Sequence, residues 1–320
     1  MTAAAITAHN GRLALIFPGQ GSQYPGMASE LVRESPTARR IIEQADDVLG
    51  YGLSKIMLSK QGEELDRTVH TQPAVFVHSM ALLEVLREQC ALSPIIAAGH
   101  SLGEYSALCA AGAMSFDTAL EIIRVRAEGM DAAQPPGTCG MAALIGPERE
   151  AAHQVVAEQR GNDVLEAANY NAPDQVVVSG HLAAVKRFIA AAKEMKRAKA
   201  VLLPVSSAFH TELMEPARRS LGEKLDRIAL KEPRFPVAAN VSGKPHPFPD
   251  GAKELLIDQV VRPVLWVDCV RTMQQAGAEL FVEVGPGKVL TGLIRRIDRK
   301  ARTVNLSSLR DVTSFAEETS

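Results

Sequence analysis

The order of apolar and mixed segments along the first part of the chain predicts strands and helices in alternation. Two short apolar runs, Leu13–Phe17 and Ile95–Ala98, each lead into a glycine-containing turn and are typical of buried strands. Helical periodicity is present over residues 28–49, 72–86, 105–111 and 116–133. Strands that alternate with helices in this way indicate a largely parallel sheet with helices on both faces.

A second pattern begins after residues 134–137, where two consecutive prolines and a glycine interrupt the helix. It predicts the order strand, helix, strand, strand, helix, strand, which is the ferredoxin-like arrangement. The predicted elements are residues 141–145, 147–160, 164–169, 175–179, 181–195 and 199–205. We therefore expect an α/β protein whose parallel-sheet core, residues 1–133 and 206–320, carries an inserted ferredoxin-like (βαββαβ) subdomain at residues 134–205.

After the insert the alternation of helices and strands resumes. The pattern predicts a helix over 211–228, a strand over 235–241, helices within 253–275 and a strand over 280–284. A turn rich in glycine and proline follows at 285–288. We expect the last ten or so residues to be frayed.

Composition and charge narrow the class of protein. Of the 320 residues 46% are hydrophobic, which is enough for a substantial core. The 35 basic and 37 acidic residues give a net charge of −2, so no global field attracts nucleic acid or an anionic membrane. No apolar run reaches the roughly 18 residues that a membrane span needs, and the N-terminus lacks the pattern of a signal peptide.

The cysteines and histidines show no spacing that indicates a disulfide or a metal site. The four cysteines lie far apart in or beside apolar segments, which favours reduced thiols and a cytoplasmic location. The eight histidines form neither an H-x-x-x-H nor an H-E-x-x-H pattern, so no metal site is predicted.

The segment Gly99–Gly103 is a Gly-x-Ser-x-Gly motif between a predicted strand and a predicted helix. Such a turn exposes the serine hydroxyl and leaves a neighbouring backbone N–H free to bind an oxyanion. The five residues alone also occur by chance in ordinary turns. Their position between a strand and a helix favours Ser101 as a nucleophile.

A serine nucleophile needs a base, and His210 lies where the last predicted strand of the insert is followed by a helix. A histidine at this position can also be only a polar residue at a helix start, and the residues leave both interpretations open. His100 is adjacent to Ser101, but side chains diverge on a sharp turn. We therefore expect His100 to orient the loop.

Two further features have both a catalytic and an ordinary interpretation. The loop Gly19–Gly21 follows the first strand, at the sheet edge where ligands collect, and its N–H groups can complete an oxyanion hole or merely form a turn. Arg126 lies in an apolar helical segment, where most arginines extend to solvent. If it pointed inward, its guanidinium would need a carboxylate or phosphate partner.

Five motifs occur in a fixed order along the chain. They are Phe17–Gln23, Thr71–Ala74, Gly99–Ala107, the pair Asn169 and Asn171 before Gln175–Val177, and Glu283–Leu290. Together they resemble the malonyl-CoA:acyl carrier protein transacylase family, over about residues 13–309. The resemblance implies a hydrolase-like α/β core in addition to the ferredoxin-like insert.

The resemblance also implies a role for each matching position. Ser101 would carry the acyl group, His210 would be its base, and the backbone carbonyl of Gln259 would orient the histidine. Arg126 would bind the malonyl carboxylate. The remaining positions are Gln20 and Leu102 as oxyanion donors, and Gln72, Asn169 and Asn171 as hydrogen-bonding pocket residues.

The implied reaction transfers malonyl from malonyl-CoA to the phosphopantetheine thiol of an acyl carrier protein, through a malonyl-serine ester. The partners would be a CoA thioester and the carrier protein, with no cofactor, and we expect a monomer. Whether the pathway makes fatty acids or polyketides stays open.

Phe209 directly precedes the implied base. The string Ala208-Phe209-His210 is similar to the malonyl-type signature of polyketide acyltransferases. A bulky ring there leaves no space for an α-methyl group, so we expect malonyl to be preferred over methylmalonyl.

Binding of CoA phosphates and of an acidic carrier protein requires positive charge near the cleft. Two local clusters of basic residues fit this need, although solvated helix faces carry such charges equally often. They are Lys196, Arg197 and Lys199 at the end of the insert, and Lys288, Arg295 and Arg296 after the glycine turn.

Two other functions are compatible with parts of the sequence. A serine hydrolase or thioesterase would use the same nucleophile but pass the acyl group to water; against it, the chain lacks an HGGG-type oxyanion loop. A non-catalytic module that docks a carrier protein would keep the fold alone, and the complete set of catalytic residue types disfavours it.

Overall fold

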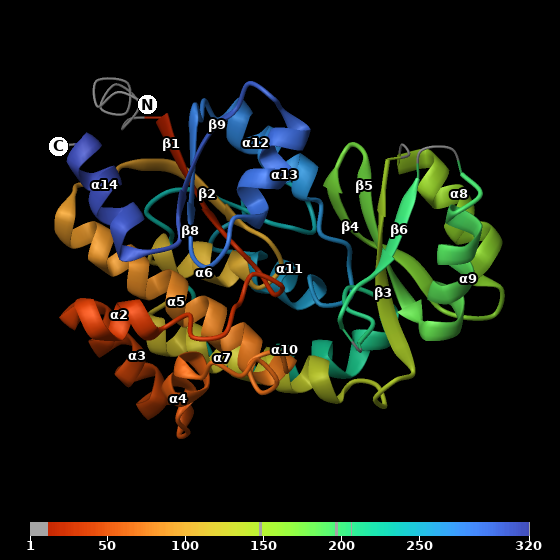
Figure 1. Ribbon diagram of the computed structural model, residues 1–320, viewed down its shortest axis with the longest axis horizontal. Coiled ribbons are helices and arrows are strands. Elements are labelled where there is room, and N and C mark those ends of the chain that lie inside the picture. Colours follow the sequence, from red (N-terminus) through yellow and green to blue (C-terminus); the bar gives the residue numbers. More distant parts are fainter. Residues whose placement is uncertain (1–11, 147–148, 196–197, 206, 320) are drawn as a thin grey trace.

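The computed structural model describes residues 12–146, 149–195, 198–205 and 207–319. Its larger part is built on a five-stranded parallel sheet in the order β7-β2-β1-β8-β9 (Figure 1). The strands are β1 (Leu13–Phe17), β2 (Pro94–Gly99), β7 (Val237–Ala238), β8 (Leu280–Val284) and β9 (Arg302–Leu306). The predicted parallel sheet is confirmed.

The central strand β1 is apolar at every position because both faces of the sheet are covered. Leu13, Leu15 and Phe17 pack into the core on one face, and Ala14 and Ile16 pack into the core on the other. The first face is covered mainly by α3 (Pro36–Leu49), α5 (Thr68–Gln89), α6 (Gly103–Ala110) and α7 (Phe116–Ala132). The second face is covered by α12 (Trp266–Gln275) and α13 (Val289–Ile297).

A separate four-stranded antiparallel sheet has the order β4-β5-β3-β6, and α8 and α9 lie on its outer side (Figure 1). The elements are β3 (Cys139–Ile145), α8 (Arg149–Arg160), β4 (Leu165–Ala172), β5 (Gln175–His181), α9 (Leu182–Ala192) and β6 (Lys199–Leu202). This is the expected βαββαβ unit, so the fold class is confirmed. The boundaries at 133/134 and 205/206 stay a prediction.

The opposite face of this second sheet turns toward the larger part. Met141, Ala143 and Val177 belong to the same apolar cluster as the helices α5 and α7, whereas Ala142 and Val178 pack with α8 and α9. Because side chains alternate along a strand, the sheet contributes one face to its own core and the other to the shared interface. A cavity described below lies at this interface.

The continuous helix expected over residues 28–49 is wrong in detail. The segment forms α2 (Ser29–Glu34) and α3, which are separated at Ser35. Ser35 is extended and its side chain accepts the N–H of Ala38 at 3.1 Å, and Pro36 follows as the first residue of α3. A serine N-cap followed by proline marks the start of a helix. The apolar periodicity of the sequence therefore ran through the boundary between two helices.

Short helical elements complete the larger part. They are α4 (Leu53–Leu58), the 3-10 turn η2 (Glu212–Met214), α10 (Glu215–Asp226) and α11 (Ala252–Asp258). Within the described ranges, no helix has both the length and the apolar character needed to cross a membrane.

The frayed C-terminus that we expected is wrong. Residues Leu309–Thr319 form α14, which packs against α5 and β9. Leu309, Val312, Phe315 and Ala316 are buried, at spacings of three and four residues that place them on one helix face. The polar residues between them face outward and conceal this amphipathic pattern.

Candidate active site

Ser101 lies on a very tight turn between β2 and α6. A Cβ atom added at Gly99 would be 1.9 Å from the carbonyl carbon of Gly103, and one added at Gly103 would be 2.1 Å from the carbonyl oxygen of Phe17. Only glycine allows this close approach. Ser101 itself has φ of 50°, a left-handed conformation that is costly for a residue other than glycine. Any residue other than glycine is therefore excluded at positions 99 and 103. The hydroxyl of Ser101 faces the cavity.

His210 is within hydrogen-bond distance of this hydroxyl. Its Nε2 lies 2.8 Å from Ser101 Oγ, and its Nδ1 lies 2.7 Å from the carbonyl oxygen of Gln259 and 3.2 Å from that of Arg262. Because carbonyls only accept, Nδ1 carries the proton and Nε2 is free to accept the serine O–H. The imidazole therefore has the tautomer that a general base for Ser101 requires.

The environment keeps this imidazole uncharged. Burial, the largest cause, and the nearby cation of Arg126 together lower the pKa of His210 to about 3, although the Gln259 carbonyl partly opposes both effects. His210 is 3% exposed, and φ of 61° places it in the left-handed region as well. The imidazole is therefore neutral at pH values well above 3.

Arg126 on α7 points inward and is 1% exposed. Its Nη2 donates to Ser101 Oγ at 2.9 Å and to the side-chain oxygen of Gln259 at 2.8 Å, and its Nη1 donates to the side-chain oxygen of Gln72 at 2.6 Å. No carboxylate is among these partners. A buried guanidinium whose acceptors are all neutral is a site prepared for an anion.

A cavity of about 110 Å³ opens in front of Ser101. Its walls come from the loops after β1 and β2, from α5 and α7, and from the inner side of the second sheet. The lining residues are Gln20, Gln72, His100, Ser101, Leu102, Arg126, Met130, Met141, Asn169, Leu203, Val205, Phe209 and His210. Four of them were not expected from the sequence: Met130, Met141, Leu203 and Val205.

Gln20 and Leu102, the two residues expected to supply oxyanion donors, both line this cavity. The backbone N–H groups of Gln20 and Leu102 make no hydrogen bond to any part of the chain that the structure describes. The side chain of Gln20 is held by Thr68 Oγ1 at 3.3 Å. Two unpaired N–H groups beside the nucleophile are the arrangement that stabilises a tetrahedral oxyanion.

The two asparagines of the insert differ in their contacts. His100 Nε2 donates to the side-chain oxygen of Asn171 at 2.7 Å, which ties the nucleophile turn to β4. Asn169 lies on the same face of β4 and lines the cavity. Gln72 holds Arg126, as described, and its nitrogen contacts the sulfur of Met130 at 3.6 Å.

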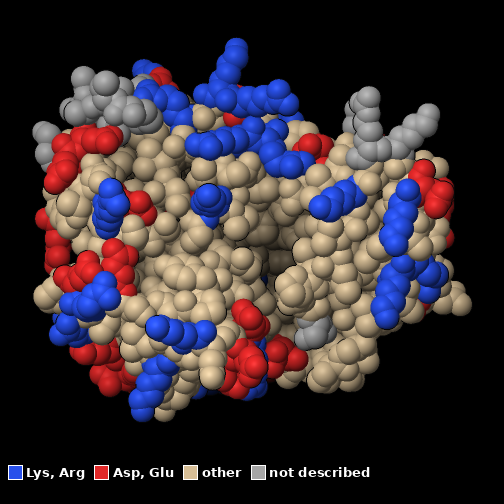
Figure 2. All heavy atoms as spheres, in the orientation of Figure 1, with Lys and Arg blue, Asp and Glu red and all other residues tan. Residues whose placement is uncertain are grey.

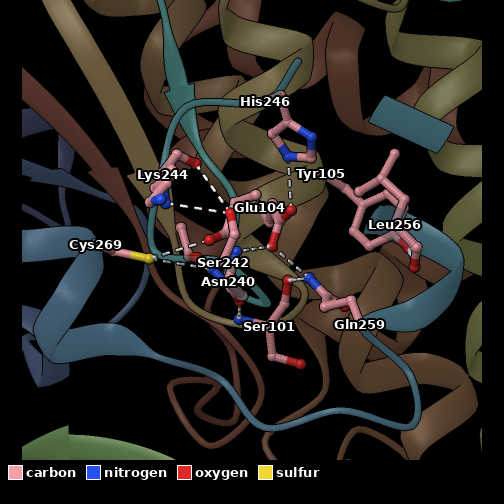
Figure 3. Close-up of polar contacts among 12 residues, drawn as sticks. Ser101, Glu104, Tyr105, Asn240, Ser242, Lys244, His246, Leu256, Gln259 and Cys269 are labelled. Carbon is pink, nitrogen blue, oxygen red and sulfur yellow. Dashed lines mark hydrogen bonds and ion pairs between the residues drawn. The ribbon is translucent and has the colours of Figure 1, made fainter. Parts of the chain in front are cut away.

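Asn240, Glu104, His246 and the side chain of Gln259 form a polar network around Ser101 that sequence reasoning missed (Figure 3). The backbone N–H of Ser101 donates to Asn240 Oδ1 at 2.7 Å, and Gln259 Nε2 donates to the Ser101 carbonyl at 2.9 Å. The sequence signal was slight, since Glu104 follows the nucleophile by three residues but its partners lie more than 130 residues away.

The structure describes four of the six residues in the expected basic clusters, and all four are exposed. Lys196 and Arg197 lie outside the described residues, and Lys199, Lys288 and Arg295 are exposed. Arg296 is paired with Asp174 at 2.7 Å. Lys and Arg side chains gather along the upper edge of the molecule in Figure 2, over the region of α13 and β9. Arg299, Lys300 and Arg302 lie in this sequence segment and were not part of our expectation.

The comparisons with known proteins agree with this geometry. A family model described as "acyl transferase domain" matches residues 14–316. The malonyl CoA-acyl carrier protein transacylase of Bacillus subtilis is 41% identical over 298 residues, covering 92% of this chain and 93% of the relative. The chain belongs to the malonyl-CoA:acyl carrier protein transacylase family.

Solved structures of the transacylase family share the whole fold. The crystal structure of the malonyl-CoA:acyl carrier protein transacylase from Xanthomonas oryzae has a TM-score of 0.92 at 38% identity, with 96% of this chain and 98% of that chain covered. A malonyl-transacylase solved in complex with its type II polyketide acyl carrier protein has a TM-score of 0.91 at 36% identity, covering 96% and 99%. The transacylase family resemblance inferred from five motifs is thus confirmed.

Proposed function

We propose that this protein transfers malonyl from malonyl-CoA to the phosphopantetheine thiol of an acyl carrier protein, through an ester on Ser101. The observation that carries the proposal is the arrangement around one hydroxyl: Ser101 Oγ lies 2.8 Å from the base His210 and 2.9 Å from the guanidinium of Arg126. A nucleophile with a neutral base and a buried cation beside it fits an acyl group that ends in a carboxylate.

In the first half-reaction His210 Nε2 takes the proton of Ser101 as the hydroxyl attacks the thioester carbonyl. The N–H groups of Gln20 and Leu102 stabilise the resulting oxyanion. Collapse breaks the carbon–sulfur bond, and the imidazolium returns its proton to the leaving CoA thiolate. In the second half-reaction the carrier thiol attacks the ester and the same groups act in reverse.

The carboxylate of the malonyl group binds Arg126. Because Nη2 is shared between Ser101 and Gln259 in the free protein, the carboxylate replaces the hydroxyl as an acceptor of this nitrogen. The hydroxyl is then left with His210 as its partner. Malonyl binding therefore frees the nucleophile from the cation and, by its negative charge, makes His210 a stronger base.

Intact-protein mass spectrometry after mixing with malonyl-CoA tests the function. A single malonyl adduct should form on the wild type and be absent from Ser101→Ala. A chase with holo carrier protein should remove it and label the carrier. If water emptied the ester as fast as the carrier protein, the protein would be a thioesterase, and if no adduct formed, it would be a docking module.

Phe209 is proposed to exclude an α-methyl group, since its ring lines the cavity and is 7% exposed. We expect Phe209→Leu to raise the ratio of methylmalonyl to malonyl turnover by about tenfold or more, in the range that one methyl group commands in an apolar pocket. Competition between the two CoA thioesters, read by mass spectrometry of the adducts, measures the ratio.

Phe188→Leu is the matched control, because Phe188 is fully buried between α9 and the second sheet, away from the cavity. It should lower the stability to a similar extent and leave the selectivity unchanged. Efficient methylmalonyl transfer by the wild type would be incompatible with the steric role of Phe209.

Carrier-protein docking is proposed at the basic edge over α13 and β9. We expect the double variant Lys288→Glu with Arg295→Glu to slow transfer from malonyl-enzyme to holo carrier protein by about tenfold, because charges at the rim govern the association rate. Transfer to free pantetheine should be unaffected. Arg40→Glu, an exposed charge on α3, is the control. If the double variant slowed transfer to the carrier protein and to free pantetheine equally, Lys288 and Arg295 would have no role in docking.

A further inference from the structure

Glu104 is a buried carboxylate that takes no direct part in the steps above. It lies in the first turn of α6 and is 0% exposed. Three N–H donors converge on it (Figure 3): His246 Nε2 at 2.7 Å on Oε1, and Gln259 Nε2 at 2.8 Å and the backbone N–H of Asn240 at 3.0 Å on Oε2. A carboxylate is the side chain suited to accept all three at once.

Two of these three partners hold the peptide groups of the nucleophile. Asn240 accepts the N–H of Ser101 and Gln259 donates to its carbonyl, so the two residues fix both sides of Ser101. The left-handed backbone of Ser101 is maintained by such contacts, since a strained conformation persists only where its surroundings impose it. Glu104 in turn fixes Asn240 and Gln259 relative to α6.

The side chain of Gln259 also connects Glu104 to Arg126. The amide of Gln259 directs its nitrogen at two acceptors, the Ser101 carbonyl and Glu104, and its oxygen at Arg126 Nη2. A flipped amide would point its NH₂ group at the guanidinium and its oxygen at a carboxylate. The negative charge of Glu104, together with the Ser101 carbonyl, therefore favours the orientation in which the amide oxygen faces the cation.

His246 anchors the carboxylate from the loop between β7 and α11. It is 7% exposed, and since Glu104 only accepts, Nε2 carries the proton. Its Nδ1 is buried and has no hydrogen-bond partner among the described residues. A shift of the proton from Nε2 to Nδ1 would leave a buried donor unpaired, so the tautomer that binds Glu104 is the favoured one.

We propose that Glu104, anchored by His246, is a positioning residue that sets both the geometry of Ser101 and the malonyl preference of Arg126. It acts through Asn240 on the nucleophile and through the amide of Gln259 on the cation. The proposal rests on the roles of Ser101 and Arg126 given above.

Glu104→Gln tests the proposal. An amide offers one acceptor and one donor group to three N–H donors, so at least one contact is lost or His246 must take its unfavourable tautomer. We expect the rate of Ser101 acylation by malonyl-CoA to fall about ten- to a hundredfold, the effect of misplacing a reacting group by a fraction of an ångström to 1 Å. We also expect the malonyl-to-acetyl ratio of kcat/KM to fall, which a loss of stability alone would not cause.

Labelling of Ser101 by a neutral sulfonyl fluoride separates the effect of Glu104 on the nucleophile from its effect on Arg126. It reports on the nucleophile without involving the substrate carboxylate, and it too should slow in Glu104→Gln. His246→Leu, which removes the anchor, should produce smaller losses in the same direction. His246→Gln should restore the acylation rate and the malonyl-to-acetyl ratio, because the amide nitrogen of glutamine can reach the position of Nε2.

Glu283→Gln is the control for a buried carboxylate. Glu283 is 0% exposed and accepts the backbone N–H groups of Leu290 and Thr291 at the start of α13, without contacting Ser101 or Arg126. It should alter stability but not the malonyl-to-acetyl ratio. A Glu104→Gln protein with the wild-type ratio and wild-type labelling rate would overturn the proposal. The adduct on the wild type and its absence in Ser101→Ala test the function independently.

Discussion

Replacing His210 by alanine is expected to slow the acylation of Ser101 by malonyl-CoA by about 10²- to 10⁴-fold. The imidazole is the proton acceptor at 2.8 Å from the hydroxyl, and the described residues offer no second side chain in that position. Quenched-flow measurement of malonyl-enzyme formation gives the rate. The binding of malonyl-CoA, which depends on Arg126, should change much less.

The pH dependence of the wild type provides a second test of the same base. Because burial lowers the pKa of His210 to about 3, the imidazole stays neutral as the pH falls through 6.5, where an exposed histidine would gain a proton. The profile of kcat/KM should therefore stay flat between about pH 7 and pH 5. A loss of kcat/KM with a midpoint near pH 6.5 would contradict the assignment of His210 as the base. So would an acylation rate in His210→Ala that is less than tenfold below the wild-type rate.

Replacing Arg126 by alanine is expected to reduce malonyl transfer by about 10- to 100-fold while acetyl transfer persists. Charge-assisted hydrogen bonds between the guanidinium and the malonyl carboxylate contribute about 1.5–3 kcal/mol. The acetyl group has no carboxylate, so acetyl transfer does not depend on this contact. Parallel measurement of kcat/KM for malonyl-CoA and acetyl-CoA gives the change in preference. Removal of the cation should also raise the pKa of His210, because Arg126 is the second cause of its depression.

Arg124→Ala is the matched control for this prediction. Arg124 lies on the same helix two residues away but does not line the cavity. Its removal should leave the ratio of malonyl to acetyl turnover unchanged. An unaltered ratio in Arg126→Ala itself would exclude the guanidinium as the group that selects the acyl chain.

The tight turn that carries Ser101 was predictable because its determinants are local. A short apolar strand, two glycines at fixed spacing and a following helix occupy adjacent positions, so the turn geometry is written in one segment of sequence. Arg126 was less certain. Its helix is apolar on a broad face, and only the tertiary structure shows that the guanidinium points inward at Gln72 and Gln259.

The supporting network was not predictable from one sequence. Asn240 meets Ser101 across 139 positions and Gln259 meets Glu104 across 155, and neither residue lies in a segment whose pattern differs from an ordinary loop or helix end. The apolar wall formed by Met141, Leu203 and Val205 was missed for the same reason. The pattern predicted strands over 141–145 and 199–205, but β6 ends at Leu202, and which side of Met141 faces the larger part depends on how the two sheets pack.

The cavity lies on a seam between two independently hydrogen-bonded sheets. The turn that carries Ser101 follows a strand of the parallel sheet, whereas Met141 and Asn169 lie on strands of the antiparallel one, and Leu203 and Val205 follow its strand β6. Part of the wall around the acyl group thus comes from a layer that carries neither Ser101 nor Arg126 nor Phe209. Met141 and Asn169 are therefore positions at which a mutant library can reshape the acyl pocket while the reactive alcohol and its strained loop stay untouched.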